Sequence, residues 1–550
     1  MKRLLVGALA LSISPALLAA NPVFDGARIS ADVKELSSDA YEGRSPATEG
    51  ERKTVAFLSA ALAEAGVQPG GDLVDGKRLW TQAVPLLMSD IVGQPELSIG
   101  RPGAHQRLTQ REQIAVRAAQ DGSSEVNLAD APLVFVGYGV HAPERNWDDF
   151  KGVDLKGKVM VVLVNDPDFE TGEGDFDGKG MTYYGRWTYK YEEAARQGAA
   201  GVLIVHETAP ASYGWATVAG SNANTMFDVV RADPRSAHTA MEGWIQRELA
   251  VSLFKDAGLD FEQLKRSAQS RDFQPVELGG QTFSARYAVN SQRITSSNVV
   301  GRIPGSTHPE ETLVYSAHWD HIGVGEPEAR GDRIFNGALD NASGSAAVLE
   351  MARAWTAGPQ PQRSVVFLFV TAEEKGLLGS EYYANNPLYP LETTVGVINI
   401  DGAAPLSPSR DFGIYGSADL ELLDRLKDVA KRWDVRYTPD SKPEAGLFFR
   451  SDHFPFAKRG VPAVSYGAGQ DLVDGGEEEG RRQSAEYIAQ RYHQQADEWQ
   501  ADWTFAGAVR DLAILHALGS ELANSRSWPA WGEGSSQFGQ VRRASDDQRN

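Results

Sequence analysis

Cysteine is absent from all 550 residues of the chain. Its absence excludes disulfide bonds, thiolate metal sites and cysteine nucleophiles, and it also excludes a lipid anchor attached through an acylated cysteine. Any metal site in this protein must therefore be built from His, Asp and Glu side chains.

The chain also lacks a run of Lys and Arg residues, and 74 acidic side chains outnumber 54 basic ones, for a formal net charge of −20. Nucleic-acid phosphates require a basic face, so we expect no nucleic-acid partner. No apolar stretch reaches the roughly 20 residues that span a bilayer, so we expect no membrane anchor. The motifs HExxH and GxSxG are both missing, which removes support for a zincin or a serine hydrolase.

The first 20 residues have the pattern of a secretory signal peptide. Lys2 and Arg3 precede an apolar run from Leu4 to Leu18, and small residues follow at Ala19 and Ala20. A buried N-terminal helix would rarely combine a charged start with a small-residue end. We therefore expect a cleavable signal and a mature protein that is periplasmic or secreted.

The order of predicted elements favours an α/β protein that carries an insert. The N-terminal part has apolar residues at helical spacing, whereas residues 89–292 contain short β-rich runs separated by turns. After residue 296 strands alternate with helices, which is typical of a mostly parallel twisted sheet flanked by helices. We predict an α/β domain at residues 21–89 and 293–522, an inserted β-rich domain at 90–292, and a polar tail at 523–550.

Ionisable side chains gather where three successive predicted strands end. His318 follows the first strand, in an HxDH sequence, and Asp401 follows the third. Glu373 and Glu374 follow the second strand, and Asp340 begins the intervening helix. Taken singly, the histidine could belong to a turn and Asp340 could be only a helix N-cap. Because ligands collect at the carboxyl ends of strands and paired carboxylates repel each other, the group together indicates a bound cation.

The number of candidate ligands favours two metal ions. One tetrahedral zinc with an open position needs three protein ligands, so a larger set of nitrogen and oxygen donors suggests two zinc ions that share a carboxylate. A water between two cations loses its proton near neutral pH, and a carboxylate outside the ligand set can act as general base. The candidates are His318, Asp340, Glu374 and Asp401, with His453 and His493 further along the chain.

Several sequence runs together resemble the dizinc aminopeptidases of the leucyl aminopeptidase, aminopeptidase S and aminopeptidase Y family. The resemblance covers residues 29–88 and 296–522, and the motifs occur in the family's order. It implies the zinc-peptidase fold and a peptide substrate with a free N-terminus. The runs are SAHWDHIG, NGALDNASG, TAEEKGLLGS, the aspartate of NIDG, RSDHFPFAKRGVPA and YHQQADEW.

This resemblance also assigns the ligands. It implies that His318 and Asp401 bind one zinc, that Glu374 and His493 bind the other, and that Asp340 bridges the two ions. His493 is preferred to His453 because the family's YHxxxD pattern matches residues 492–497.

Further roles follow from the same resemblance. Glu373 would be the general base, and Tyr492 would donate a hydrogen bond to the oxyanion of the tetrahedral intermediate. Asp320 would orient His318 as a hydrogen-bond acceptor. Arg450 would lie beside the substrate, and His453 would line the substrate pocket or support the metal ligands.

The insert resembles a protease-associated domain through the runs PLVFVGYGVHAP, LKGKVMVVLVNDP and ARQGAAGVLIV. Such a domain would cap or flank the catalytic site without supplying a metal ligand.

We therefore expect a secreted or periplasmic zinc aminopeptidase that uses a metal-bridged water. One alternative is a non-catalytic, receptor-like peptide-binding protein on the same fold. Another is a carboxypeptidase or a glutaminyl cyclase relative, because the ligands alone do not encode which chain end is cleaved. The sequence does not indicate an oligomeric state.

Overall fold

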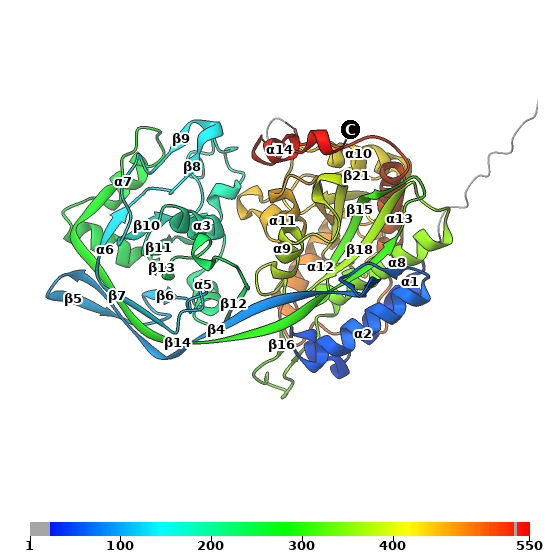
Figure 1. Cartoon of the computed structure of the whole chain (residues 1–550), viewed down its shortest axis with the longest axis horizontal. Helices are drawn as coiled ribbons and strands as arrows, with labels where there is room; N and C mark the ends of the chain where they lie inside the picture. The colour runs from blue at the N-terminus through cyan, green and yellow to red at the C-terminus, as the bar shows by residue number, and fades with distance from the viewer. Residues whose placement is uncertain (1–22, 533–535, 550) are drawn as a thin grey trace, which may run out of the picture.

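The computed structural model describes residues 23–532 and 536–549. The predicted signal peptide, residues 1–20, lies outside this range. Figure 1 shows two lobes joined by two long strands. Within the described residues, no helix combines the length and the apolar character needed to cross a lipid bilayer.

One lobe, here called the core lobe, contains the predicted α/β domain. It is built on four neighbouring parallel strands, which lie in the order β22, β19, β15 and β18. Every residue of β18 and β19 is buried, as expected of parallel strands that are covered on both faces. The bounds of these strands are His308–His318 for β15, Arg363–Val370 for β18, Thr394–Ile400 for β19 and Ala463–Ala468 for β22.

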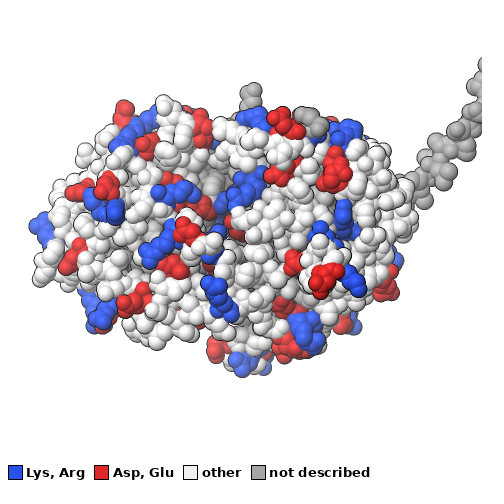
Figure 2. All heavy atoms as spheres, viewed as in Figure 1, with Lys and Arg blue, Asp and Glu red and all other residues white. Residues whose placement is uncertain are grey.

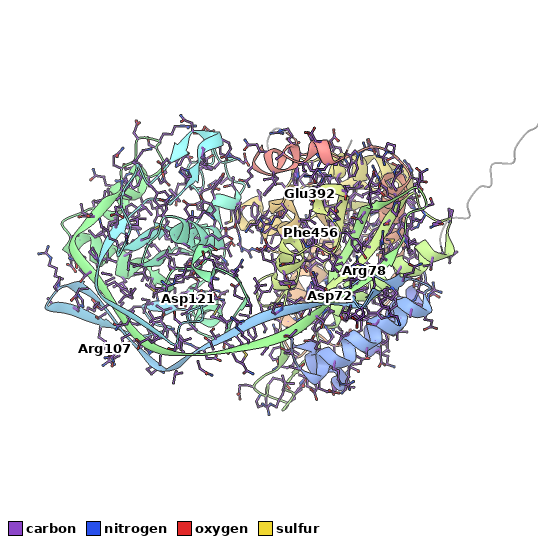
Figure 3. All side chains as sticks on the ribbon, in the orientation of Figure 1. Asp72, Arg78, Arg107, Asp121, Glu392 and Phe456 are labelled. Carbon is purple, nitrogen blue, oxygen red and sulfur yellow. The ribbon has the colours of Figure 1, made fainter. Side chains whose placement is uncertain are left out.

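Helices cover both faces of this sheet. Val365 and Phe367 belong to one apolar cluster, whereas Val366 and Leu368 belong to another, because successive side chains of a strand point to opposite faces. The first face packs against α1 (Gly26–Leu36), α2 (Glu49–Glu64), α8 (Gly344–Ala357), α10 (Glu421–Ala430) and α13 (Ala506–Ala523), and the second against α9 (Leu378–Asn385) and α11 (His453–Lys458). Phe456 of α11, which belongs to the cluster on the second face, is labelled in Figure 3.

The other lobe, here called the insert lobe, contains most of the predicted insert at residues 90–292. It has its own parallel strands, in the order β7, β10, β11 and β13, with β6 antiparallel at the edge. Val162 and Trp244 belong to an apolar cluster that lies within this lobe and is separate from the clusters that contain the core-lobe strands. The bounds are Ile114–Val116 for β6, Glu125–Phe135 for β7, Val159–Leu163 for β10, Gly201–His206 for β11, Met241–Gln246 for β13, Trp187–Arg196 for α3, Thr208–Ala211 for α4, Trp215–Asn222 for α5, Arg247–Asp256 for α6 and Phe261–Ser267 for α7.

Two antiparallel strands, β4 (Thr81–Arg101) and β14 (Val276–Ile303), run from one lobe into the other. β14 pairs with β18 in the core lobe and with β7 in the insert lobe. A single sheet of 16 strands therefore passes through both lobes. The domain borders that the sequence suggested, at 89/90 and 292/293, fall inside these two strands.

Shorter elements complete the fold. These are β1 (Gln68–Pro69), β2 (Leu73–Val74), β3 (Lys77–Arg78), β5 (Ala104–Leu108), β8 (His141–Ala142), β9 (Trp147–Asp148), β12 (Met226–Val229), β16 (Gly323–Val324), β17 (Ile334–Phe335), β20 (Asp411–Ile414), β21 (Arg436–Tyr437), α12 (Gly476–Gln490) and α14 (Ser536–Arg543).

The predicted fold class is confirmed: an α/β protein with a mostly parallel sheet flanked by helices. The predicted polar tail, residues 523–550, contains α14. Phe538 of this helix is buried against Trp531, and the Arg542 guanidinium donates to the main-chain oxygen of Thr394. This helix is therefore packed onto the core lobe through Phe538 and Arg542.

Candidate metal centre

The ionisable residues that the sequence singled out meet at the carboxyl edge of the core-lobe sheet. His318 is the last residue of β15, and Asp401 directly follows β19. Glu373 and Glu374 lie in the loop after β18. Asp340 lies in the turn that precedes α8. The parallel strand order brings these loops together although they are far apart in the chain.

His318, Asp340 and Asp401 form the first of two adjacent groups. The His318 Nε2 atom lies 3.1 Å from Asp401 Oδ1 and 3.3 Å from Asp340 Oδ1. One donor atom from each of these three residues lies within 4.8 Å of the other two. This spacing would allow all three to contact one metal ion.

The second group lies on the other side of Asp340. The His493 Nε2 atom is 3.2 Å from Asp340 Oδ2 and 3.2 Å from Glu374 Oε2. Asp340 thus directs one carboxylate oxygen toward His318 and the other toward His493.

The same group contains His321, to which sequence reasoning assigned no role. His321 is fully buried, and its Nδ1 atom lies 2.6 Å from Glu374 Oε1. With Asp340 and Glu374 it forms a set of three donors within 4.8 Å. The signal was available in the sequence, because the HxDH run contains two histidines.

The donor set fits a divalent cation. Four carboxylates crowd into the site with side chains that are between 6% and 17% exposed, so their mutual repulsion is weakly screened. Within the described part of the chain, the buried Nε2 atom of His321 has no hydrogen-bond partner. Imidazole nitrogens and carboxylate oxygens without thiolates are a set that zinc accepts. The four carboxylates belong to Asp340, Glu373, Glu374 and Asp401.

The two adjacent glutamates, Glu373 and Glu374, differ in the direction in which their surroundings shift their pKa values. Burial raises the pKa of Glu373 well above its usual range, and the charges of Asp401 and Glu374 raise it further against the opposing effect of His318. Burial also acts to raise the pKa of Glu374, but its contacts with His321 and His493 bring it down to about 2. Glu374 therefore stays ionised, whereas Glu373 can hold and release a proton.

Asp320 supports the site differently from the expectation. The His318 Nδ1 atom lies 3.1 Å from the main-chain oxygen of Asp320, and the carboxylate is 3.9 Å away. The carboxylate instead accepts hydrogen bonds from the main-chain N–H groups of Glu373 and Glu374, at 3.0 and 3.4 Å. Its function is thus to fix the loop after β18, because the turn after β15 directs the side chain there.

Two further residues fix the ligand loops. The Asp497 carboxylate accepts hydrogen bonds from the main-chain N–H groups of Leu339 and Asp340, both at 3.1 Å to its Oδ2 atom. The fully buried Arg44 donates to four main-chain oxygens: those of Leu36, Trp319, Asn336 and Gly337. Arg44 thereby ties the N-terminal segment to the loops that carry His318 and Asp340.

Asp401 is held by two hydroxyl groups that the sequence did not reveal. The Ser451 Oγ atom donates to Asp401 Oδ2 at 2.8 Å, and the Tyr415 hydroxyl donates to the main-chain oxygen of Asp401 at 2.6 Å. A lone serine or tyrosine carries no sequence signal for such a role.

Tyr492 lies beside the cluster at the surface. Its side chain is 42% exposed, and its ring stacks on the ring of His493 with centroids 4.0 Å apart. Partial burial, together with the charges of Asp340 and Glu374, raises the pKa of the Tyr492 hydroxyl above its usual value. The hydroxyl therefore stays protonated at neutral pH and can donate a hydrogen bond.

His453 does not join this site. It is fully buried at the start of α11, and its ring packs edge-on against Phe448 with centroids 4.6 Å apart. Burial lowers its pKa to about 3. The expected position lining a substrate pocket is wrong, because the first turn of α11 is directed into an aromatic cluster.

Arg450 lies at the junction of the two lobes. Its Nη2 atom donates to the Ser212 hydroxyl of the insert lobe at 3.0 Å. Figure 2 shows a hollow between the lobes with basic side chains beside it.

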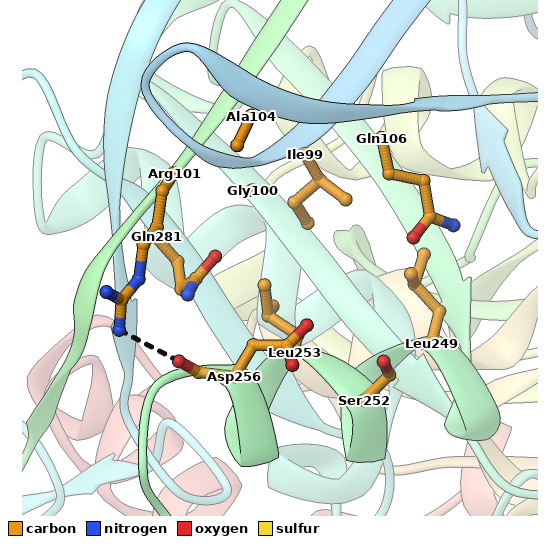
Figure 4. Close-up of a pocket in the computed structure, with 10 residues that line it drawn as sticks. All are labelled: Ile99, Gly100, Arg101, Ala104, Gln106, Leu249, Ser252, Leu253, Asp256 and Gln281. Atoms are coloured by element: carbon orange, nitrogen blue, oxygen red, sulfur yellow. Dashed lines mark hydrogen bonds between the residues drawn. The ribbon is translucent and has the colours of Figure 1, made fainter.

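A separate hollow of about 340 Å³ lies on the insert lobe, between a β-hairpin and α6 (Figure 4). Its lining includes Ile99, Gln106 and Leu253, and the Arg101 Nη2 atom donates to the main-chain oxygen of Asp256 at its rim. None of the candidate metal ligands lines this hollow.

Comparison with known proteins supports the resemblance for part of the chain. Residues 298–517 match the model of Peptidase family M28. Leupeptin-inactivating enzyme 1 of Streptomyces exfoliatus is 31% identical over 201 residues, which are 35% of this chain and 42% of that protein. Aminopeptidase NAALADL1 of Mus musculus is 31% identical over 180 residues, 28% of this chain and 21% of that protein. The chain thus spans less than half the length of these curated relatives.

Among solved structures, an aminopeptidase from Aneurinibacillus sp. strain AM-1 is similar at 18% identity, with a TM-score of 0.49 over 91% of this chain and 94% of that chain. BSAP, a zinc aminopeptidase from Bacillus subtilis, has 17% identity and a TM-score of 0.42 over 91% of this chain and 96% of that chain.

Proposed function

We propose that this protein is a zinc-dependent aminopeptidase that removes N-terminal residues from peptides. The observation that carries the proposal is the position of Asp340, with one carboxylate oxygen toward His318 and the other toward His493. A carboxylate between two sets of donors is the arrangement needed to share two ions.

In this proposal His318 and Asp401 hold one zinc, Glu374 and His493 hold the other, and Asp340 contacts both. His321 is an additional candidate for the second site, because it lies as close to Glu374 as a hydrogen-bond partner would. Bound zinc would supply Lewis-acid polarisation of the peptide carbonyl and lower the pKa of a water.

Glu373 acts as the general base. It is in the cluster, its Oε2 atom lies 4.0 Å from His318 Nε2, and its raised pKa suits a group that takes a proton and then releases it. It takes the proton from the attacking water and delivers it to the leaving amine. The Tyr492 hydroxyl donates a hydrogen bond to the oxygen on which negative charge develops.

The insert lobe, predicted as a protease-associated domain at residues 90–292, would shape access to this centre. The support is that none of the proposed ligands lies in it and that the surface is hollowed at its junction with the core lobe (Figure 2). We further propose that residues 1–20 direct export and that the protein acts in the periplasm or outside the cell.

A non-catalytic peptide-binding protein is the competing interpretation. Peptide binding alone needs no general base, whereas Glu373 is a carboxylate with a raised pKa next to the proposed ligand set. A carboxypeptidase would use the same ligands, so the substrate end must be measured.

The test is hydrolysis of matched peptides with free and acetylated N-termini, before and after dialysis against a chelator. We expect cleavage of the free peptides alone, loss of activity on chelation, and recovery with added zinc. Equal cleavage of acetylated peptides, or full turnover without metal, would contradict the proposal.

A further inference from the structure

The junction between the lobes contains a buried arginine without an ionic partner. Arg186, the residue before α3, is 8% exposed. Among the described residues its Nε atom has no hydrogen-bond partner, and no carboxylate is among the groups that act on the pKa of its guanidinium. Burial lowers its pKa to about 10, and Arg450 contributes to that change in the same direction.

Arg450 brings a second guanidinium to this junction from the core lobe, where the ring centroid of Tyr183, three residues before Arg186, lies 6.0 Å from that of Phe449, the residue before Arg450. Its one hydrogen bond through Nη2 goes to the neutral Ser212 hydroxyl, and the guanidinium lies 5.8 Å from the ring centroid of Tyr213. Within the described chain, its buried Nε atom also lacks a partner. Besides burial, Arg450 and the phenols of Tyr213 and Tyr183 act on the pKa of Arg186, and the phenols of Tyr213 and Tyr492 act on that of Arg450; no carboxylate is among these groups.

Two partly desolvated cations at one junction without an anion are unfavourable in a folded protein. A buried charge normally has a counter-ion, and its removal from water is unfavourable when no partner compensates. Such an arrangement becomes favourable when a ligand brings the missing negative charge. Arginine suits this function because its planar fork of N–H donors matches a carboxylate.

Arg450 also lies close to the proposed metal centre. Arg450 directly precedes Ser451, whose hydroxyl donates to Asp401 Oδ2 at 2.8 Å. The Tyr492 phenol, which stacks on His493, is near enough to act on the pKa of Arg450. A carboxylate bound at Arg450 is therefore within reach of a short peptide whose N-terminal residue occupies the metal centre.

We propose that Arg186 of the insert lobe and Arg450 of the core lobe together bind a carboxylate of the peptide substrate. This inference rests on the proposed aminopeptidase function and refines its substrate class to short or acidic peptides. The carboxylate is either the C-terminus of a di- or tripeptide or an acidic side chain near the scissile bond. The insert lobe then contributes directly to specificity.

Two pairs of peptides distinguish these sources. Leu-Gly-Gly and its C-terminal amide differ only in the terminal carboxylate, whereas Leu-Glu-Gly-amide and Leu-Gln-Gly-amide differ only in the side chain. We expect kcat/KM to favour the carboxylate by about 10-fold or more in at least one pair, mainly through KM, as a charge-assisted hydrogen bond provides. Equal kcat/KM within both pairs would overturn the proposal.

Substitution of Arg186 tests the residue itself. R186M should reduce the preference for the carboxylate by about 10-fold, and R186K should retain part of it because the charge remains without the fork. The matched control is R101Q, which removes an exposed arginine of the same lobe and should leave the preference unchanged. An unchanged preference in R186M would contradict the assignment.

A stability measurement separates binding from a structural role. Because R186M removes an uncompensated buried charge, its melting temperature should equal or exceed that of the wild type. A large decrease would indicate that Arg186 supports the fold and would overturn the inference. If no peptide is cleaved, the proposed function fails, and calorimetric titration of the same peptide pairs then decides the carboxylate site by the same preference.

Discussion

Glu373 and Glu374 show how much adjacent residues of the same type can differ. Both lie in the loop after β18, and both have main-chain N–H groups held by Asp320. Glu374 faces two histidines and is kept ionised, whereas Glu373 faces further carboxylates and has a raised pKa. Glu374 therefore suits a metal ligand, and Glu373 suits a general base.

Replacement of Glu373 by Gln should separate chemistry from metal binding. General-base removal typically lowers the rate by about 100-fold to 10,000-fold, so E373Q should lose kcat to that extent while it retains the metal content of the wild type. Metal analysis and steady-state kinetics on the same preparations provide the test. E374Q is the comparison, since it should lose metal. A loss of metal in E373Q would mean that the two roles are exchanged.

Asp497 should control metal affinity although it contacts no predicted ion. Its carboxylate holds the N–H groups of Leu339 and Asp340, so D497A should release the loop that presents the bridging carboxylate. Loss of such a supporting contact typically weakens metal binding by about 10-fold to 100-fold. Competition with a zinc-sensitive dye would measure this change, and an affinity equal to that of the wild type would exclude the proposed positioning role.

The sequence predicted the position of the candidate ligands well, because a polar residue at the end of a buried apolar strand is a local signal. Sequence reasoning failed where the position of a side chain depends on tertiary packing. His453 follows Arg450 in a promising motif, yet α11 directs it into the aromatic cluster with Phe448. Ser451 and Tyr415 support Asp401 through contacts between segments that no local pattern connects.

At the scale of elements, β12 and β13 of the insert lobe are linked by a buried histidine. His238 contacts the carboxylates of Asp228 and Glu242, each at 2.9 Å. Burial by itself would lower its pKa, but these two charges raise it to about 9. The charged imidazole thus joins Asp228 of β12 to Glu242 of β13, and Arg231 and Arg117 form further ion pairs with these two carboxylates.

This contact predicts a pH-dependent stability. The folded-state pKa of about 9 exceeds the usual value of 6.5, so the stabilisation is fully present below pH 6.5 and is lost as the pH rises through 9. The melting temperature of the wild type should therefore fall between these limits by more than that of H238Q, which cannot be protonated. Parallel melting curves of the two proteins from pH 6 to 10 would show it, and identical slopes would refute it.

Long elements were predicted better than their ends and connections. The helix and strand periodicity of the core lobe is confirmed by α8, β18 and β19. The lengths of β4 and β14 were missed, because the sequence changes character near residue 90 while the backbone continues as one strand. Packing of α14 was missed because Phe538 is isolated among polar neighbours.

At the scale of the whole molecule, the lobes share a sheet and a core. The largest apolar cluster contains Phe135 and Phe254 of the insert lobe as well as Leu313 and Phe367 of the core lobe. Independent domains would be connected by linkers with few contacts, whereas here two long strands pair along both lobes.

We therefore predict that the metal-loaded protein unfolds in a single calorimetric transition. Disruption of β4 and β14 removes strand partners from both lobes at once, so neither lobe should survive the loss of the other. Scanning calorimetry at several scan rates would measure this. Two resolved transitions, with one that is unaffected by a chelator, would show that the lobes unfold independently.

The pairing of β4 with β14 also sets an order of events during synthesis. Thr81 pairs with Val299 and Gly100 pairs with Thr282, so β4 leaves the ribosome long before its partner exists. At about 5 to 20 residues per second, the first strand waits roughly 10 to 40 s with an unpaired edge. During that interval the nascent chain presents a long strand that other chains can pair with, which makes it a natural client for a chaperone that binds extended segments.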